Sequence, residues 1–348
     1  MKAAVFNAAG QPLTIESVDD PTPGEREVVI QVGACGICGT DLHWTETHGT
    51  EGGWRPLARG GILGHEFAGE IVEVGAAARQ QFHPGDLVCA LPFIGCGTCD
   101  ACRKGRVFRC QRVETRGSPA LPGAYAEFAR VGLAEAVRLP AGVGARTGAL
   151  VEPLAVGLAA AERARFEPGA SILIMGAGPV GLAVSLWCRF LGARHVVVSD
   201  LVGERAERAA EFGATEAIDA GRESVRERMR SIAGGRPDVV FECVGLPGTL
   251  QLAIDEVADD GCVVVAGLCM RPDTFKPAVA LVKAIDLRFT MCYEKHHFER
   301  IATLLGEGEI DPANLVTDTV GMHAFPARFE ALKQTGSDLK VVLEPHRD

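Results

Sequence analysis

The chain has 348 residues, 47% of them hydrophobic and 23% charged, a composition typical of a globular protein with about two domains. Its formal net charge of −10 and the lack of a Lys/Arg run argue against nucleic acid as a partner. No apolar signal-type segment follows Met1, so we expect a cytoplasmic protein whose 12 cysteines form no disulfide framework.

The first 150 residues are predicted to be mainly β-structure with few helices. Short runs of β-forming residues alternate with turns rich in Gly and Pro, a pattern typical of all-β segments. The expected strands are Glu27–Val32, Phe67–Val74, Leu87–Ala90 and Tyr125–Val131.

Residues 151–290 are predicted to alternate buried strands with helices, which is typical of βαβ units around a parallel sheet. The uncharged stretch Ser171–Cys188 contains several glycines and a proline that would break a spanning helix, so we expect no membrane span. The expected strands are Ser171–Met175, His195–Ser199, Val239–Cys243 and Cys262–Gly267, and the expected helices are Val180–Leu191, Glu204–Phe212, Ser224–Ile232 and Leu250–Val257.

The pattern changes again near residue 290. Two expected helices, Phe298–Leu305 and Ala324–Gln334, separate expected strands at Leu315–Val320 and Leu339–Glu344. We expect this tail, residues 291–348, to complete the first domain. The predicted fold class is therefore α/β, with a β-rich domain over residues 1–150 and a doubly wound dinucleotide-binding domain over residues 151–290.

The first candidate metal ligands in chain order are Cys38, His65, Glu66 and Glu152. A cysteine, a histidine and a carboxylate provide three mixed ligands and leave one position open for water or substrate, as catalytic zinc requires. Glycines beside Cys38 and His65 suit the tight turns that bring ligands together. Taken singly, each of these residues is better explained as an ordinary core or surface residue, and their long-range spacing alone does not establish a metal site.

A cluster of four cysteines is the second candidate metal site. It consists of Cys96, Cys99, Cys102 and Cys110. Four thiolates complete the tetrahedral shell of zinc, so this site is predicted to be structural, and nothing else in the sequence supports the alternative of an iron–sulfur cluster. We expect the basic side chains of Arg103, Lys104 and Arg106 to offset the thiolate charge.

A glycine-rich turn follows the apolar strand Ser171–Met175 and opens a helix. Its residues are Gly176-Ala177-Gly178-Pro179-Val180-Gly181, the strand–turn–helix context that a dinucleotide fingerprint requires. Asp200 ends the next strand, where a carboxylate binds ribose hydroxyls and repels a 2′-phosphate. This favours NAD over NADP, although Arg205 lies close enough in sequence to accept a phosphate instead.

Together these motifs resemble the medium-chain, zinc-dependent alcohol dehydrogenases, in the branch with threonine, polyol and butanediol dehydrogenases. The resemblance spans essentially the whole chain and rests on Gly36–His43, Gly64-His65-Glu66, Cys96–Cys110, Val151–Leu154 and Gly176–Gly181 with Asp200. It implies a GroES-like β-rich catalytic domain, a Rossmann NAD-binding domain, and one catalytic and one structural zinc ion per chain.

The resemblance also implies roles for individual residues. Cys38 and His65 would be zinc ligands, with either Glu66 or Glu152 as the third, and the two carboxylates could exchange during turnover. Thr40 and His43 would relay the proton that alcohol oxidation releases. Residues expected to line the NAD site are Val180, Arg205, Val244, Ala266, Gly267, Leu268, Cys292 and Tyr293.

The substrate is expected to be a secondary alcohol, either apolar or cyclic or a vicinal diol, that is oxidised to a ketone. L-threonine and sugar polyols are the alternative substrates. The non-enzymatic alternative is a catalytically inactive protein that binds NAD and zinc. By analogy we expect a homodimer or homotetramer. Candidate pocket residues are apolar or aromatic, namely Trp44, Trp54, Leu57, Phe93, Ile94 and Tyr293.

Overall fold

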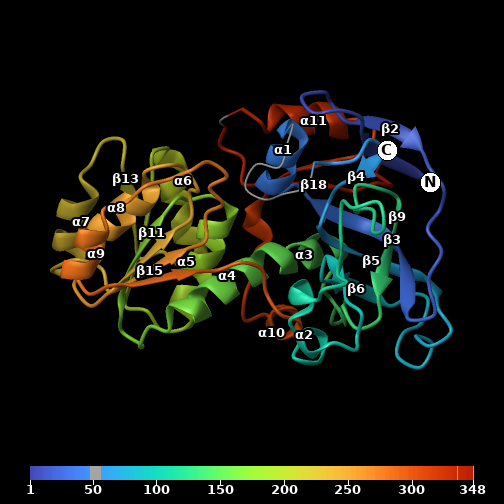
Figure 1. Cartoon of the computed structure of the whole chain (residues 1–348), viewed down its shortest axis with the longest axis horizontal. Coiled ribbons are helices and arrows are strands. Elements are labelled where there is room, and N and C mark those ends of the chain that lie inside the picture. Colours follow the sequence, from blue (N-terminus) through green and yellow to red (C-terminus); the bar gives the residue numbers. More distant parts are fainter. Residues whose placement is uncertain (48–55, 335, 348) are drawn as a thin grey trace. The chain divides into compact units, whose positions relative to one another are not determined.

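The computed structural model describes residues 1–47, 56–334 and 336–347, which form two compact units (Figure 1). Unit 1 comprises Met1–Glu152 and Tyr293–Asp348, and unit 2 comprises Pro153–Cys292. Trp44 and the other pocket candidates are described, except Trp54, which lies outside these ranges. No helix in the described ranges is both long and apolar enough to cross a membrane.

Unit 1 is built around a largely antiparallel sheet in the order β10-β6-β5-β3-β18-β17, with β9 pairing with β3. Strand β3 is its centre, because it pairs with β5, β9 and β18. The strands are β3 (Glu27–Gly36), β5 (Glu66–Val74), β6 (Leu87–Ala90), β9 (Phe128–Gly132), β10 (Ala136–Arg138), β17 (Val316–Val320) and β18 (Lys340–Leu343).

Smaller elements surround this sheet. A second sheet has the order β2-β1-β4, and β7 pairs with β8. The strands are β1 (Lys2–Phe6), β2 (Thr14–Ser17), β4 (Gly61–Ile62), β7 (Phe93–Ile94) and β8 (Glu114–Thr115), and the helices are α1 (Gly39–Glu46), α2 (Asp100–Arg103), α3 (Ala145–Ala149), α10 (Lys295–Glu307), α11 (Phe325–Ala331) and the 3₁₀ turns η2 (Val107–Arg109) and η4 (Ala313–Leu315).

The C-terminal tail lies beside the first part of the chain within unit 1. Val342 and Leu343 of β18 pair antiparallel with Gly36 and Cys35 of β3. The side chain of Leu343 joins a core cluster that also contains Tyr125, Phe325 and Phe329, and Val342 packs in a separate cluster with Ala34 and Ala149. The tail therefore packs directly against the end of β3, from which Cys38 follows.

Unit 2 contains a six-stranded parallel sheet in the order β13-β12-β11-β14-β15-β16, and helices cover both of its faces (Figure 1). The sequence order reverses between β11 and β14, which is the switch point of a doubly wound fold. The strands are β11 (Ser171–Met175), β12 (His195–Asp200), β13 (Glu216–Asp219), β14 (Val239–Glu242), β15 (Cys262–Val265) and β16 (Asp286–Phe289).

The helices of the middle segment are amphipathic, and their apolar faces meet the sheet. Met229, Ala253 and Ile254 pack with Leu173 and Val240 in one buried cluster. The α/β fold class is confirmed by this alternation. The helices are α4 (Val151–Ala164), α5 (Pro179–Phe190), α6 (Gly203–Glu207), the 3₁₀ turn η3 (Arg208–Phe212), α7 (Val225–Ala233), α8 (Thr249–Glu256) and α9 (Pro277–Val282).

The strand expected at Tyr125–Val131 begins three residues later than predicted, at Phe128. The preceding backbone is not part of this strand because it bonds elsewhere: the Tyr125 N–H donates to Leu63 O, and the Ala124 N–H donates to Gly64 O, each at 2.9 Å. This difference matters for the site, since it places Tyr125 against the turn that carries His65.

Candidate active site

Cys38 lies at the N-cap of α1, two residues after β3 ends at Gly36. Its carbonyl oxygen accepts a hydrogen bond from the Asp41 N–H at 3.0 Å, which begins the helix. The Cys38 side chain is half-buried. Thr40 is the second residue of α1 and half-buried, whereas His43 is exposed on its last turn. The helix and its N-cap therefore carry Cys38, Thr40 and His43, together with the pocket candidate Trp44.

His65 and Glu66 reach Cys38 through the pairing of β5 with β3. Glu66 is the first residue of β5 and lies opposite Gly36. A Cβ atom at position 36 would lie 2.2 Å from Glu66 Oε2, so only glycine leaves room for this carboxylate. One ligand atom each from Cys38, His65 and Glu66 lies within 4.8 Å of the other two.

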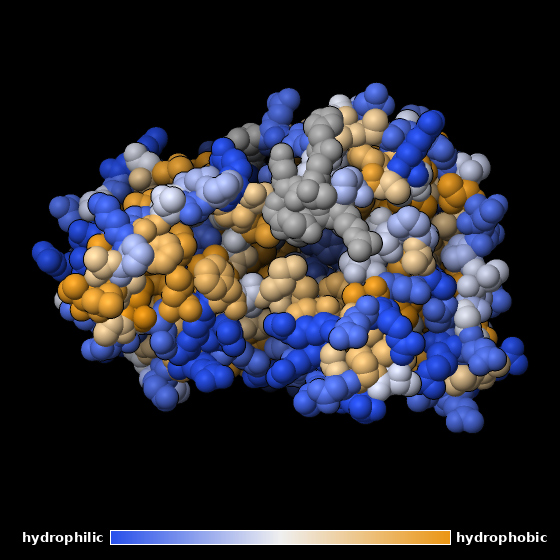
Figure 2. Space-filling model, in the orientation of Figure 1, coloured by the Kyte–Doolittle hydropathy of each residue, from blue (hydrophilic) through white to orange (hydrophobic). Residues whose placement is uncertain are grey.

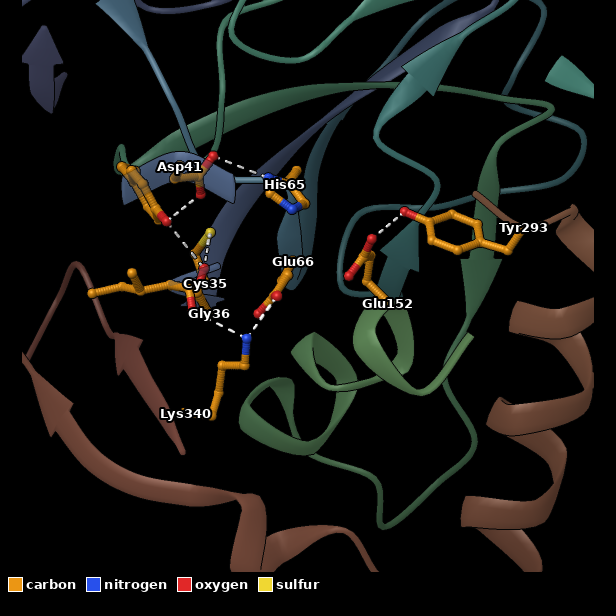
Figure 3. A network of polar contacts seen from close by, with 10 residues as sticks. Cys35, Gly36, Asp41, His65, Glu66, Glu152, Tyr293 and Lys340 are labelled. Carbon is orange, nitrogen blue, oxygen red and sulfur yellow. Dashed lines mark hydrogen bonds and ion pairs between the residues drawn. The ribbon is translucent and has the colours of Figure 1, made fainter. Parts of the chain in front are cut away.

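Glu66 is a buried carboxylate with one paired and one unpaired oxygen. Its side chain is 1% exposed, and Oε1 lies 2.7 Å from Nζ of Lys340, which is 3% exposed (Figure 3). Although burial lowers the pKa of Lys340, Glu66 and Cys38 raise it above its usual value, so this lysine is charged. Glu66 Oε2 has no hydrogen-bond partner.

An unpaired buried carboxylate oxygen is costly unless an ion or donor satisfies it. The thiol of Cys38, the imidazole of His65 and this carboxylate form a donor set that suits zinc with three protein ligands. The residues present therefore fit a catalytic zinc ion.

The imidazole of His65 is oriented by a second carboxylate. His65 Nδ1 lies 3.1 Å from Asp41 Oδ1, as Figure 3 shows. Burial opposes the protonated imidazole, but Asp41 and Cys38 raise the pKa of His65 well above its usual value. A carboxylate that accepts the Nδ1 proton fixes the tautomer and leaves Nε2 for a metal.

Glu152 lies apart from this group of three ligands. It is the second residue of α4 and 7% exposed, and its Oε1 accepts a hydrogen bond from the Tyr293 hydroxyl (Figure 3). Burial raises the pKa of Glu152 to about 7, which the neighbouring Glu66 charge supports and His65 opposes. Tyr293 is itself 4% exposed, so this hydrogen bond is shielded from water.

The four-cysteine loop brings its sulfur atoms within 4.8 Å of one another. Backbone N–H groups point at the sulfurs: those of Cys99 and Cys102 lie 3.4 and 3.5 Å from Cys96 Sγ and Cys99 Sγ, and that of Arg112 lies 3.3 Å from Cys110 Sγ. Such donors stabilise thiolates. Four thiolates in this arrangement fit a structural zinc ion with no open position.

The basic side chains expected to offset the thiolate charge are engaged elsewhere. Arg103 donates to Thr98 O at 2.7 Å, Lys104 pairs with Asp100 at 2.9 Å, and Arg106 pairs with Glu294 at 3.2 Å. The Thr98 hydroxyl and the backbone N–H groups of Thr98 and Cys99 lower the pKa of Cys96 to about 5, and Arg112 makes a smaller contribution in the same direction. Arg112 follows the last cysteine by two residues, so its position alone did not distinguish it.

The glycine-rich turn in unit 2 has the geometry of a dinucleotide-binding turn. Gly176 has φ +100°, and a Cβ at Gly181 would lie 1.9 Å from Gly176 O, so helix and turn pack too closely for a side chain. A Cβ at Gly178 would meet nothing within 4 Å. Pro179 begins α5, whose N-terminus therefore faces open space where a pyrophosphate can bind.

Asp200 lies at the end of β12 and holds this turn in place. Its Oδ2 accepts from the Ala177 N–H at 2.8 Å and its Oδ1 from the Val202 N–H at 2.9 Å. Each oxygen keeps a further lone pair for a ribose hydroxyl. Arg205 lies on α6 and is half-buried.

Other residues expected to line the NAD site follow strands β14 and β15. Val244 is 42% exposed and Leu268 39%, and Glu242 Oε1 accepts from the N–H groups of Val244 and Gly245 at 2.9 Å each. A Cβ at Gly267 would lie 2.4 Å from Gly245 N, so these two loops touch. Val180, Ala266 and Cys292 are half-buried.

Three residues in this site were not singled out from the sequence: Asp41, Tyr125 and Lys340. Asp41 follows Cys38 by three residues within the motif Gly36–His43, but the weak periodicity of that segment does not distinguish it. Lys340 is 274 residues from Glu66, and Tyr125 is 84 residues from Asp41. No local pattern marks either of them.

Two known families match this chain over separate ranges. The family described as "Alcohol dehydrogenase GroES-like domain" matches residues 24–141, and the family described as "Zinc-binding dehydrogenase" matches residues 179–307. The first match contains Cys38, His65 and the four-cysteine loop. The second contains the rest of the glycine-rich turn from Pro179 onward, together with Asp200.

Individual relatives match over nearly the full chain. Sorbitol dehydrogenase of Bacillus subtilis (strain 168) is 34% identical over 351 residues, covering 100% of this chain and 98% of the relative. A zinc-binding dehydrogenase of Sinorhizobium meliloti 1021 bound to NADP is 28% identical, with a TM-score of 0.89 and 99% of both chains covered. Alcohol dehydrogenase of Thermus sp. ATN1 is 31% identical, with a TM-score of 0.89 over 99% of this chain and 100% of that one.

Proposed function

Because this chain belongs to the zinc-dependent medium-chain dehydrogenases, we propose that it oxidises a secondary hydroxyl of a vicinal diol to a ketone, with NAD as hydride acceptor. The supporting observation is the convergence of Cys38, His65 and Glu66 within 4.8 Å, with Glu66 Oε2 unpaired. We assign these three residues as ligands of the catalytic zinc and Glu152 as a neighbouring carboxylate held by Tyr293.

A zinc ion bound there supplies Lewis-acid chemistry that lowers the pKa of a substrate hydroxyl. The chain's own residues position the site. Lys340 holds the Glu66 carboxylate, and Asp41 holds the His65 imidazole. Thr40 begins the proposed proton path close to Cys38, and the exposed His43 ends it at solvent on the last turn of the same helix.

The cofactor preference follows from Asp200. Replacing Asp200 with asparagine removes the charge that would repel a 2′-phosphate and keeps one acceptor oxygen for Ala177 or Val202. We expect the ratio of kcat/KM for NADP to kcat/KM for NAD to rise about tenfold, equivalent to about 1.4 kcal/mol. Initial rates of NADH and NADPH formation measure this ratio.

The control removes a different carboxylate from the same unit. Glu204 is exposed at the start of α6, and its replacement by glutamine changes the net charge equally. The ratio should stay within about twofold, as expected for a solvent-screened surface charge. Equal ratios in the Asp200 and Glu204 variants would show that Asp200 does not determine the preference for NAD over NADP.

The relative from Bacillus subtilis, whose match covers the whole chain, is a sorbitol dehydrogenase and favours the sugar polyols given above as an alternative. Sorbitol contains vicinal diols, so this relative also supports the proposed diol class. An apolar secondary alcohol is the second candidate, because Trp44 lies on the helix that begins after Cys38 and the Tyr293 hydroxyl donates to Glu152. The Phe93 and Tyr293 rings are 6.4 Å apart, and a Cβ at Gly117 would lie 3.3 Å from the Trp44 ring. Ile94 belongs to β7 beside Phe93, and Leu57 packs against the same apolar core as Trp44.

A substrate panel distinguishes these candidates. Sorbitol, 2,3-butanediol, cyclohexanol and L-threonine are offered with NAD and NADP in parallel, and reduced cofactor is read by absorbance. The proposal predicts the highest kcat/KM for one of the first two compounds. Faster oxidation of cyclohexanol favours the apolar pocket, and no turnover of any alcohol by protein holding both zinc ions would contradict the proposed activity.

We also propose that the chain forms a homo-oligomer through β16, the edge strand of the unit 2 sheet. Apolar side chains gather on this unit, as Figure 2 shows, and near the strand Leu281, Val282, Phe289 and Met291 are 79%, 81%, 61% and 62% exposed. An edge strand with exposed apolar side chains on and beside it can pair with a strand of another copy. In such an oligomer, β16 of one copy would pair with β16 of a second copy, so that each copy covers the exposed apolar side chains of the other.

Replacing Phe289 with glutamate should shift the protein from a dimer or tetramer toward smaller species. A charge placed at an apolar interface opposes association because it must lose its hydration. Light scattering coupled to size-exclusion chromatography gives the mass directly. A wild-type mass equal to one chain would contradict the proposal, and an unchanged oligomer in the variant would place the interface elsewhere.

A further inference from the structure

The ring and the hydroxyl of Tyr125 lie in different environments. The residue is fully buried, and its ring lies in the apolar core, 4.7 Å from the ring of Phe325 and 6.0 Å from that of Phe329. Phenylalanine would fill the same space. A tyrosine hydroxyl buried among such neighbours is unfavourable unless it has a partner.

The partner of this hydroxyl is Asp41. The Tyr125 oxygen lies 2.5 Å from Asp41 Oδ2 and 3.3 Å from Gly36 O. A hydroxyl has one proton, and the shorter contact to the buried carboxylate is the stronger, charge-assisted bond. Burial, reinforced by the Asp41 charge, raises the pKa of Tyr125 well above its usual value, so the phenol remains a donor.

Asp41 has both of its oxygens committed by these contacts. Oδ2 accepts from Tyr125, and Oδ1 faces His65 Nδ1 at 3.1 Å. Asp41 is 1% exposed, so water does not replace either partner readily. The orientation of the His65 imidazole therefore depends on a carboxylate whose own orientation depends on the Tyr125 hydroxyl.

Tyr125 also contacts the turn that carries His65. Its N–H donates to Leu63 O at 2.9 Å, and a Cβ at Gly64 would lie 2.6 Å from Tyr125 Cδ1. The tyrosine ring therefore lies directly on the backbone of Gly64. Gly64 also has φ +98°, a conformation that favours glycine. One residue thus fixes the position of His65 through its backbone and ring, and its orientation through Asp41.

We propose that Tyr125 is a positioning residue for the zinc ligand His65, and that its hydroxyl slows loss of the metal by holding Asp41 in place. This inference rests on the proposed function, in which Cys38, His65 and Glu66 bind the catalytic zinc. Tyr125 would touch neither substrate nor metal, and its contribution would be separate from the packing that a phenylalanine also provides.

The test compares zinc release from the wild-type holoenzyme and from Tyr125→Phe, using a chromophoric chelator in excess. Substitutions of residues that hold the metal ligands by hydrogen bonds typically alter metal affinity about 10- to 100-fold. We therefore expect release of the catalytic zinc to accelerate about tenfold. Release from the four-cysteine site should be unchanged and serves as an internal control. Ser185→Ala, which removes a buried hydroxyl from unit 2, should change neither rate.

A second pair of variants separates positioning from packing. Asp41→Asn should accelerate release more than Tyr125→Phe does, because it removes the charged acceptor itself. If Tyr125 acts through Asp41, adding Tyr125→Phe to Asp41→Asn should have little further effect, whereas independent packing effects would multiply.

Three results would overturn the inference: unchanged release in Tyr125→Phe, equal acceleration at both zinc sites, or fully multiplicative effects in the double variant. Failure of the proposed function itself has a different signature. In that case the wild-type protein would release zinc from the four-cysteine site alone, before any variant is compared.

Discussion

Replacing Cys38 with alanine should leave the protein with one zinc ion per chain and reduce turnover by about 10³-fold or more. Removal of a thiolate leaves only His65 and Glu66 to hold the catalytic ion, and the four-cysteine loop keeps its own. A bound zinc contributes several kcal/mol to stabilising developing charge, and about 4 kcal/mol corresponds to 10³-fold. Metal content by mass spectrometry and NADH formation measure the two effects.

The control is Cys89→Ala, which removes a fully buried thiol from β6 of the same unit. This variant loses some packing but no proposed ligand, so it should keep both zinc ions and turnover within about twofold of wild type. If Cys38→Ala retained both ions and full turnover, the three-ligand assignment would be wrong.

Replacing Lys340 with methionine should destabilise unit 1 of the zinc-free protein by about 3 kcal/mol or more. The substitution leaves Glu66, 1% exposed, with a buried charge and no cation beside Oε1. Breaking a buried ion pair from one side typically costs about 3–5 kcal/mol, because the remaining charge stays in a site of low polarity. Lys340 also donates to Ile37 O at 3.0 Å, so the segment before Cys38 should loosen as well.

Urea unfolding followed by circular dichroism measures this loss, with two controls. Lys340→Arg keeps the positive charge and should recover part of the stability. Lys104→Met breaks an exposed pair with Asp100 at 2.9 Å and should cost less than about 1 kcal/mol. If Lys340→Met cost no more than Lys104→Met, the Lys340–Glu66 pair would be unimportant for stability.

Short-range patterns predicted unit 2 well. The strand Ser171–Met175 has the predicted bounds, and the helix expected at Val180–Leu191 spans Pro179–Phe190. Both elements follow from one local pattern, which consists of an apolar run, a glycine turn and an amphipathic helix. No distant residue is needed to identify them. The resemblance to zinc-dependent medium-chain dehydrogenases, which rested partly on these motifs, is confirmed by the family matches.

In unit 1, helix α1 was not predicted because its hydrophobic periodicity is weak. Helix α1 has almost no preferred apolar face, and only Asp41 and Thr45 are buried on it. Its position is determined by contacts that Asp41 makes with His65 and Tyr125, which come from other segments. The helix that carries Glu152 was also missed.

The surroundings of the proposed zinc ligands depend on pairings between distant segments. Glu66 meets Gly36 across β3 and β5, and Lys340 reaches Glu66 only because β18 pairs with the end of β3. Neither relation has a signature in one sequence. The ligand types could be named from the chain, whereas the residues that hold them in place required the fold.

The most direct test of the central claim is anomalous scattering at the zinc absorption edge, recorded from crystals of the purified protein. The account predicts two anomalous peaks per chain, one among Cys96, Cys99, Cys102 and Cys110 and the other among Cys38, His65 and Glu66. A single peak in the four-cysteine loop, or a second peak away from those three residues, would contradict the proposal that this chain holds a catalytic zinc there.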